Sequence, residues 1–203
     1  MDNLVSVFPS LFLPPISYFK LLLHASNPII DIYEHYPKQT CRNRCFIFAA
    51  NGVMPLVIPV HKIEHHTPIK DIKIAYKSNW QTTMWRSIAS AYGSSPFFTY
   101  YDYILEPMFK QKIEFLVDYN TRLSELILKL LKIPFEFNFS SAYIENNILA
   151  DYRNNFGKHY RNHDNVLKNN YHQPFETKFG FQHDLSILDL LFNEGPNAIQ
   201  YLI

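Results

Sequence analysis

Glu34 and His35 are neighbours in the chain and have the side chains that proton transfer requires. They follow an apolar segment, residues 29–33, which we interpret as a buried strand. An imidazole gains and loses a proton near neutral pH, and a carboxylate beside it can orient it. The sequence therefore predicts His35 and Glu34 as catalytic residues; the alternative is a solvated loop with an ordinary histidine.

Arg42 and Arg44 are separated by one residue and form a second candidate. On an extended strand they would lie on one face about 7 Å apart, a spacing that suits a diphosphate or two carboxylates. Arginine binds such oxygens through paired hydrogen bonds. The alternative is a polar strand end with two exposed cations. With the polar residues around them they give the predicted substrate-binding set of Ser10, Tyr18, Gln39, Arg42, Asn43 and Arg44.

Metal-ligating side chains are dense in His61-Lys62-Ile63-Glu64-His65-His66. This segment lacks the helical pattern that would bring two of its histidines onto one face, and Pro68 follows it. Cys41 and Cys45 lie too far apart on a strand for a disulfide and are too few for a zinc site, so we expect reduced thiols. We predict no metal site, and the sequence leaves the cofactor unknown.

Asp189 lies within an apolar helical pattern, among Leu185, Leu188 and Phe192. An ionised carboxylate on an apolar face requires a cationic or hydrogen-bonding partner. We predict a structural role for Asp189, and a bond to one of the two arginines would join its helix to the candidate site.

The elements that must position these residues begin with a strand–helix–strand unit. Residues 4–8 form an apolar run, and a helix is expected between Pro14 and Asn27. With the strand over 29–33, this predicts a parallel, right-handed βαβ crossover. Ligands of such sheets bind beyond the carboxyl ends of the strands, where the N–H groups that open the helix could hold an anion.

A β-hairpin is expected next, with strands over 42–50 and 53–60 joined by an Asn-Gly turn signal. With Phe48 opposite Pro55, a two-residue turn would demand an N–H that proline lacks. We therefore predict a four-residue loop, 50–53, and an edge position for the second strand.

The rest of the chain predicts helices that begin at Trp80, at Pro107, at a cap formed by Asn120 and at a cap formed by Asp184, with a short last helix through Ile203. Residues 138–171 lack periodicity and predict loops. The predicted fold class is α/β, a mixed sheet begun by the right-handed βαβ unit with a β-hairpin at its edge, followed by a helical C-terminal half. We expect a single domain over 1–203, with the α/β part at about 1–76 and the mainly helical part at about 80–203.

The composition excludes several classes of function. The chain of 203 residues has a formal net charge of +1, with 47% hydrophobic and 18% charged residues, which is typical of a globular domain. A balanced charge argues against nucleic acid as a partner. No apolar run reaches the roughly 18 residues of a membrane span, and Asp2 is unlike the start of a signal peptide. We expect a cytoplasmic protein without membrane insertion that acts on a small molecule.

Five segments of the chain together resemble the WbqC-like protein family of bacteria. In chain order they are residues 8–19, 34–44, 51–60, 94–101 and 185–196. The similarity spans nearly the whole chain and is weakest over residues 138–171.

The resemblance implies a role in the biosynthesis of bacterial surface polysaccharide, such as the O-antigen of lipopolysaccharide, because members occur in the corresponding gene clusters. Transfer of an amino acid, such as glycine, to a sugar has been suggested for the family, and no catalytic residues come with it. Two hypotheses follow. In the first, the protein is a transferase whose arginines hold an activated sugar or acyl donor while His35 deprotonates the acceptor. In the second, it is a non-catalytic module that binds a sugar or nucleotide within a biosynthetic complex, with aromatic residues such as Tyr100 for stacking.

Overall fold

The structure is a computed structural model and describes residues 4–158, 160 and 170–203. The strands are β1 (Val5–Phe8), β2 (Pro28–Ile30), β3 (Arg44–Ala49), β4 (Gly52–Val57) and β5 (Ile148–Asp151). The helices are α1 (Ile16–His24), α2 (Trp80–Tyr92), α3 (Phe98–Leu105), α4 (Leu116–Leu130), α5 (Glu176–Phe179), α6 (Ile187–Glu194) and α7 (Ile199–Leu202). Short 3-10 helices cover Ile69–Asp71, Glu106–Phe109 and Gly195–Ala198.

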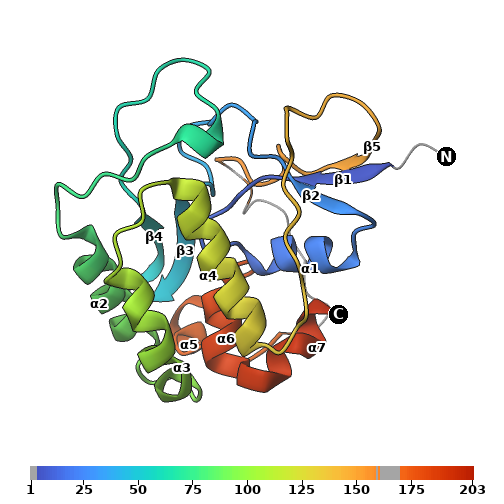
Figure 1. Ribbon diagram of the computed structural model, residues 1–203. Coiled ribbons are helices and arrows are strands. Elements are labelled where there is room, and N and C mark those ends of the chain that lie inside the picture. Colours follow the sequence, from blue (N-terminus) through green and yellow to red (C-terminus); the bar gives the residue numbers. More distant parts are fainter. Residues whose placement is uncertain (1–3, 159, 161–169) are drawn as a thin grey trace.

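A small parallel sheet forms one side of the molecule, with β1 between β2 and β5 (Figure 1). Helix α1 connects β1 to β2, so the predicted parallel strand–helix–strand unit is confirmed. Ile16, Phe19 and Leu22 recur at helical spacing and are buried, because this face of α1 packs into the core. Helix α1 also contacts the C-terminal helices α6 and α7. The α/β fold class is therefore confirmed.

The third strand of this sheet, β5, lies within residues 138–171, where loops were predicted. Its four residues alternate between half-buried and exposed, and they pair with β1 across a register shift after Val5. A strand this short carries no long hydrophobic pattern, and its place is set by pairing with the apolar β1.

Strands β3 and β4 form a separate antiparallel sheet instead of extending the parallel one. Ala49 pairs with Gly52 across a two-residue turn, so the predicted four-residue loop is wrong and the pairing is shifted by two residues, with Phe48 opposite Val53 instead of Pro55. The left-handed φ of Gly52, 100°, is one that glycine adopts readily. Pro55 consequently lies opposite Phe46 at a position without ladder hydrogen bonds, and its missing N–H faces outward, as the edge-strand prediction requires.

The helical half differs from prediction between residues 106 and 131. Instead of two helices that begin at Pro107 and Asn120, the chain makes a 3-10 turn and then the single helix α4. Phe115 is extended and forms a bridge with Lys73, and Leu116 N–H donates to the Ile72 carbonyl at 2.9 Å, so α4 begins only at Leu116. Asn120 therefore lies inside α4 and is buried, so it is not a cap. Helix α3 was not predicted.

Asp184 does not cap its own helix. Helix α6 is capped by Ser186, whose Oγ accepts from the backbone N–H of Leu188 at 3.4 Å. The Asp184 carboxylate instead accepts from the N–H and the hydroxyl of Ser17, at 2.8 and 2.7 Å, in the first turn of α1. The Asp184 carboxylate is thus an anion of the chain itself, bound at the start of α1, where the sequence predicted that N–H groups could hold an anion.

The C-terminal helices α5, α6 and α7 lie together at the bottom of the view in Figure 1. Helix α4 runs down the middle of the same view, and Leu123 and Ile127 on its inner face are fully buried. Within residues 4–158, 160 and 170–203, none of the helices has the length and apolar character that crossing a bilayer requires.

Candidate functional site at the carboxyl ends of the parallel strands

Two aspartates meet one arginine at the carboxyl ends of β2 and β5. Asp31 follows β2 directly and is fully buried, and Asp151 is the last residue of β5. Arg153 Nη1 lies 2.7 Å from Asp31 Oδ2, and its Nη2 lies 2.6 Å from Asp151 Oδ2. Hydrogen bonds from Arg153 lower the pKa of Asp151 below its ordinary value. Parallel strands bring their ends to one edge, which explains how residues more than a hundred positions apart meet here.

A second buried ion pair joins Arg42 to Glu34. Arg42 Nε donates to Glu34 Oε1 at 2.7 Å and its Nη2 to Oε2 at 2.5 Å, and the two side chains are 2% and 6% exposed. The same Nη2 donates to the backbone carbonyl of Arg153 at 2.9 Å, which connects both pairs. Burial raises the pKa of Glu34, and the Arg42 guanidinium opposes this shift. We call Asp31, Glu34, Arg42, Asp151 and Arg153 the ionic network.

His35 points away from this network. Consecutive residues of an extended segment face opposite sides, so Glu34 turns inward to Arg42 while His35 is exposed. The structure therefore does not pair His35 with Glu34. Instead, His35 Nδ1 lies 3.3 Å from His66 Nδ1, and its ring lies parallel to that of Tyr143 at a centroid distance of 6.5 Å.

Tyr143 connects the histidines to the ionic network. The guanidinium of Arg153 lies 4.6 Å from the centroid of the Tyr143 ring, in a cation–π contact. The predicted base, His35, thus belongs to an exposed aromatic cluster that lies beside the buried charges at the carboxyl ends of the strands.

Arg44, the first residue of β3, differs from Arg42. Its side chain is half-buried and its Nε is inaccessible to solvent without a hydrogen-bond partner. Among the residues that the structure describes, Arg44 forms no ion pair and no side-chain hydrogen bond. Burial raises the pKa of Tyr36 to about 12, and both Arg42 and Arg44 oppose this shift, which places both guanidinium groups near that phenol.

Three other predicted substrate-binding residues use their polar atoms inside the fold. Ser10 is buried and its Oγ accepts from Asn120 Nδ2 at 3.3 Å. Asn43 is also buried, and its Nδ2 donates to the Ile58 carbonyl at 2.8 Å. The buried Tyr18 hydroxyl donates to the backbone carbonyl of residue 9 at 2.8 Å, and burial raises the pKa of this phenol.

Ser10 and Tyr18 also line a small cavity with Asn120 and Ser124 of α4. Its free volume of about 10 Å³ matches one water molecule, which is too small for a substrate group. Gln39, the remaining member of the predicted set, is exposed and has a left-handed φ of 62°.

Asp189 is fully buried in α6, and two residues of the segment before that helix donate hydrogen bonds to it. Its Oδ2 accepts from the Tyr171 hydroxyl at 2.5 Å and from Gln173 Nε2 at 2.8 Å. Among the described residues, no bond joins Asp189 to Arg42 or Arg44, so Asp189 does not connect α6 to these two arginines. The segment before α6 thus supplies hydrogen-bond donors that the buried Asp189 carboxylate requires.

The comparisons with known proteins bear on the chain as a whole. The family model described as the WbqC-like protein family matches residues 10–161. The chain belongs to this family. The search of curated proteins and the search of solved structures each find no match. The matched range contains His35, Arg44 and the whole ionic network, and it ends before Asp189.

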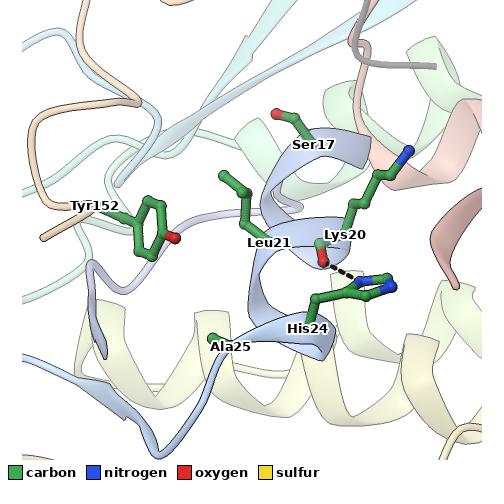
Figure 2. Close-up of a pocket in the computed structure, with 6 residues that line it drawn as sticks. All are labelled: Ser17, Lys20, Leu21, His24, Ala25 and Tyr152. Carbon is green, nitrogen blue, oxygen red and sulfur yellow. Dashed lines mark hydrogen bonds between the residues drawn. The ribbon is translucent and has the colours of Figure 1, made fainter. Parts of the chain in front are cut away.

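A hollow with mainly apolar walls lies beside α1 of this WbqC-like protein, away from the predicted residues. It has a volume of about 420 Å³ and is lined by Ser17, Lys20, Leu21, His24, Ala25 and Tyr152. Figure 2 shows the Tyr152 ring facing the helix and the 2.8 Å bond between His24 Nδ1 and the Lys20 carbonyl. A volume of this size suits a small ligand such as a sugar.

Within the part of the chain that the structure describes, no group of three or more histidine, cysteine, aspartate or glutamate side chains is placed to hold one metal ion. Cys41 and Cys45 are free and buried, as the sequence predicts.

The sequence analysis of this WbqC-like chain missed Asp31, Arg153 and the contact between His35 and His66. Asp31 interrupts an apolar run, Ile29-Ile30-Asp31-Ile32, and a carboxylate in a buried segment is a signal that a cation lies nearby. Arg153 gave no such signal, because it lies in the aperiodic segment around β5.

Proposed function

We propose that this WbqC-like protein is a transferase that moves an acyl or aminoacyl group from an activated donor to a sugar, in the biosynthesis of bacterial surface polysaccharide. Membership of the family supports the pathway. The single observation that carries the proposal of an anionic donor is the half-buried Arg44, which has no counter-charge among the described residues.

Arg44 supports the binding of an anionic donor. A guanidinium that is partly withdrawn from water loses hydration energy, and a paired anion restores it. Arg42 and Arg153 already have carboxylate partners inside the fold, whereas the two Nη groups of Arg44, a planar donor set, have no carboxylate partner among the described residues. A phosphate or carboxylate of the donor fits this set through two parallel hydrogen bonds.

His35 is the proposed base. When its Nδ1–H donates to His66 Nδ1, its Nε2 is free to accept a proton, and the contact with His66 orients the ring. The acceptor amine or hydroxyl gives its proton to Nε2 while its nitrogen or oxygen bonds to the acyl carbon of the donor. The bond from that carbon to the phosphate oxygen or thioester sulfur breaks, and its electron pair leaves with the phosphate or thiolate. The proton on His35 then passes to solvent or to the leaving group.

A ligand screen tests the donor class. Thermal unfolding is measured with nucleotide sugars, acyl phosphates, acyl thioesters and amino acids, because a ligand of the folded state raises the melting temperature. A compound that binds the wild type should bind Arg44→Gln about 10- to 100-fold more weakly, the loss expected for charge-assisted hydrogen bonds. Arg86→Gln, which changes an exposed arginine of α2, is the matched control and should keep full affinity. Equal binding by both variants would refute the role of Arg44.

His35→Ala then separates binding from chemistry. It should keep the affinity for the donor and lose turnover, measured as acyl transfer to the sugar acceptor, if His35 is the base. Unchanged turnover in His35→Ala would exclude this role.

The hollow beside α1 favours a second function, a non-catalytic module that binds a sugar or nucleotide. Its aromatic wall, Tyr152, could stack on a ring, and its volume of about 420 Å³ is sufficient. Ala25→Trp fills this hollow. Under this alternative it abolishes ligand binding, whereas Arg44→Gln leaves binding intact.

A further inference from the structure

His35 and His66 come from two segments that the backbone holds in register. His35 forms an antiparallel bridge with Pro68, and Tyr36 N–H donates to the Thr67 carbonyl at 3.0 Å. His66 has a left-handed φ of 63°, a region in which few non-glycine residues lie, histidine being one of the enriched exceptions. The fold thus fixes the positions from which the two rings meet.

The distance between the rings fits a shared metal ion. Nδ1 of His35 and Nδ1 of His66 are 3.3 Å apart, and the rings are inclined at 66°. In a tetrahedral zinc site with Zn–N bonds of about 2.0–2.1 Å, two ligand nitrogens lie about 3.3–3.4 Å apart. We propose that His35 and His66 form a two-histidine site for Zn²⁺ or a similar divalent transition metal, bound through both Nδ1 atoms.

The surroundings favour a cation at this point. Both side chains are exposed, so an ion can reach them from solvent. The ionic network beneath Tyr143 contains three carboxylates and two guanidinium groups, which gives a formal charge of −1. The proton that one Nδ1 carries in the metal-free pair moves to Nε2 of the same ring, so coordination leaves both imidazoles neutral.

Two protein ligands leave coordination positions for water or for an anionic group of a ligand. His65 is adjacent to His66 in sequence, but the centroids of their two rings lie 6.1 Å apart, so we do not include His65 among the ligands. Imidazole ligands select transition metals, so Mg²⁺ should not bind. With the metal bound, His35 Nε2 carries a proton, so the metal site and the proposed base role of His35 belong to different states of the ring, and the metal proposal does not rest on the transferase function.

Isothermal titration calorimetry with ZnCl₂ tests the site on the full chain. We expect one Zn²⁺ per chain in the wild type and an affinity that falls by about tenfold or more in both His35→Ala and His66→Ala, because each removes one of two ligands. His61→Ala is the matched control, an exposed histidine of the same segment, and should bind as the wild type. Unchanged affinity in His66→Ala, or an equal loss in His61→Ala, would overturn the proposal.

The visible spectrum of the Co²⁺-loaded protein gives a second measurement that does not rely on variants. A strong d–d band, typical of tetrahedral cobalt, is the expected result. A weak band, typical of the hydrated ion, would overturn the proposed geometry. Thermal unfolding of each variant shows that the fold is retained, since both residues are exposed.

Discussion

Replacing Glu34 by glutamine tests the buried ion pair with Arg42. Glutamine keeps the size of the side chain and one oxygen for Arg42 Nε, but its NH₂ group then faces the donor Nη2. Arg42 is 2% exposed and cannot lose its proton, so its charge stays buried without a partner. Removing one partner of such a pair costs about 3–5 kcal/mol, which corresponds to a fall of about 6–20 °C in Tm for a chain of this length.

Replacing the other partner of the pair, in Arg42→Met, should lower the free energy of unfolding by an amount that depends on pH. Burial already raises the pKa of Glu34, and without Arg42 it rises further. A raised pKa favours the protonated folded state, so this contribution to stability is present below the ordinary value of 4.5 and is lost as the pH rises through the folded-state pKa. Arg42→Met should therefore be closer to the wild type at pH 5 than at pH 8, whereas Glu34→Gln, which lacks the titrating carboxyl, should not approach the wild type at the lower pH.

Urea unfolding followed by circular dichroism measures these free energies at both pH values. Glu125→Gln, an exposed glutamate of α4, is the matched control and should change stability by less than about 0.5 kcal/mol. A cost below about 1 kcal/mol for Glu34→Gln, or the same pH dependence for both network variants, would refute the reasoning.

Three further predictions concern other parts of the fold. Arg153 lowers the pKa of Asp151, so their pairing stabilises the fold above pH 3.8, and this contribution is lost as the pH falls through the lower folded-state pKa. Asp151→Asn should therefore be less stable than the wild type at neutral pH and approach it in acid. A difference in Tm that persists in acid would contradict this. Asp184→Ala removes two hydrogen bonds at the start of α1 and should cost about 1–3 kcal/mol in urea unfolding, and an unchanged midpoint would disprove the cap. Burial raises the pKa of both cysteine thiols, so the native protein should resist Ellman's reagent at pH 8 and yield two thiols once unfolded; rapid labelling of the native protein would show that they are accessible.

The parallel strand–helix–strand unit, the hairpin and the extent of α2 follow from local patterns. Apolar runs define β1 and β2, and the break at Gly93 ends α2 close to where the sequence predicts. The hairpin pairing differs by two residues, because Gly52 joins the ladder where the Asn-Gly signal suggested a turn. These elements are determined by residues close together in sequence.

The arrangement of the polar residues depends on long-range contacts, which local patterns do not contain. Asp184 caps α1 from 167 positions away, and Asn120 in α4 donates to the Arg42 carbonyl at 2.9 Å. The predicted spacing of the two arginines assumed a continuous strand, but β3 begins only at Arg44. Arg42 therefore lies in the preceding turn, where it reaches Glu34.

Titration of the wild type and of Arg44→Gln with a nucleotide-activated sugar or an acyl phosphate is the most direct test of the proposed donor site. Calorimetry should show binding to the wild type and to Arg86→Gln, and a dissociation constant for Arg44→Gln that is higher by about 10- to 100-fold. Identical dissociation constants for all three proteins would contradict the assignment of Arg44 as the residue that holds the donor.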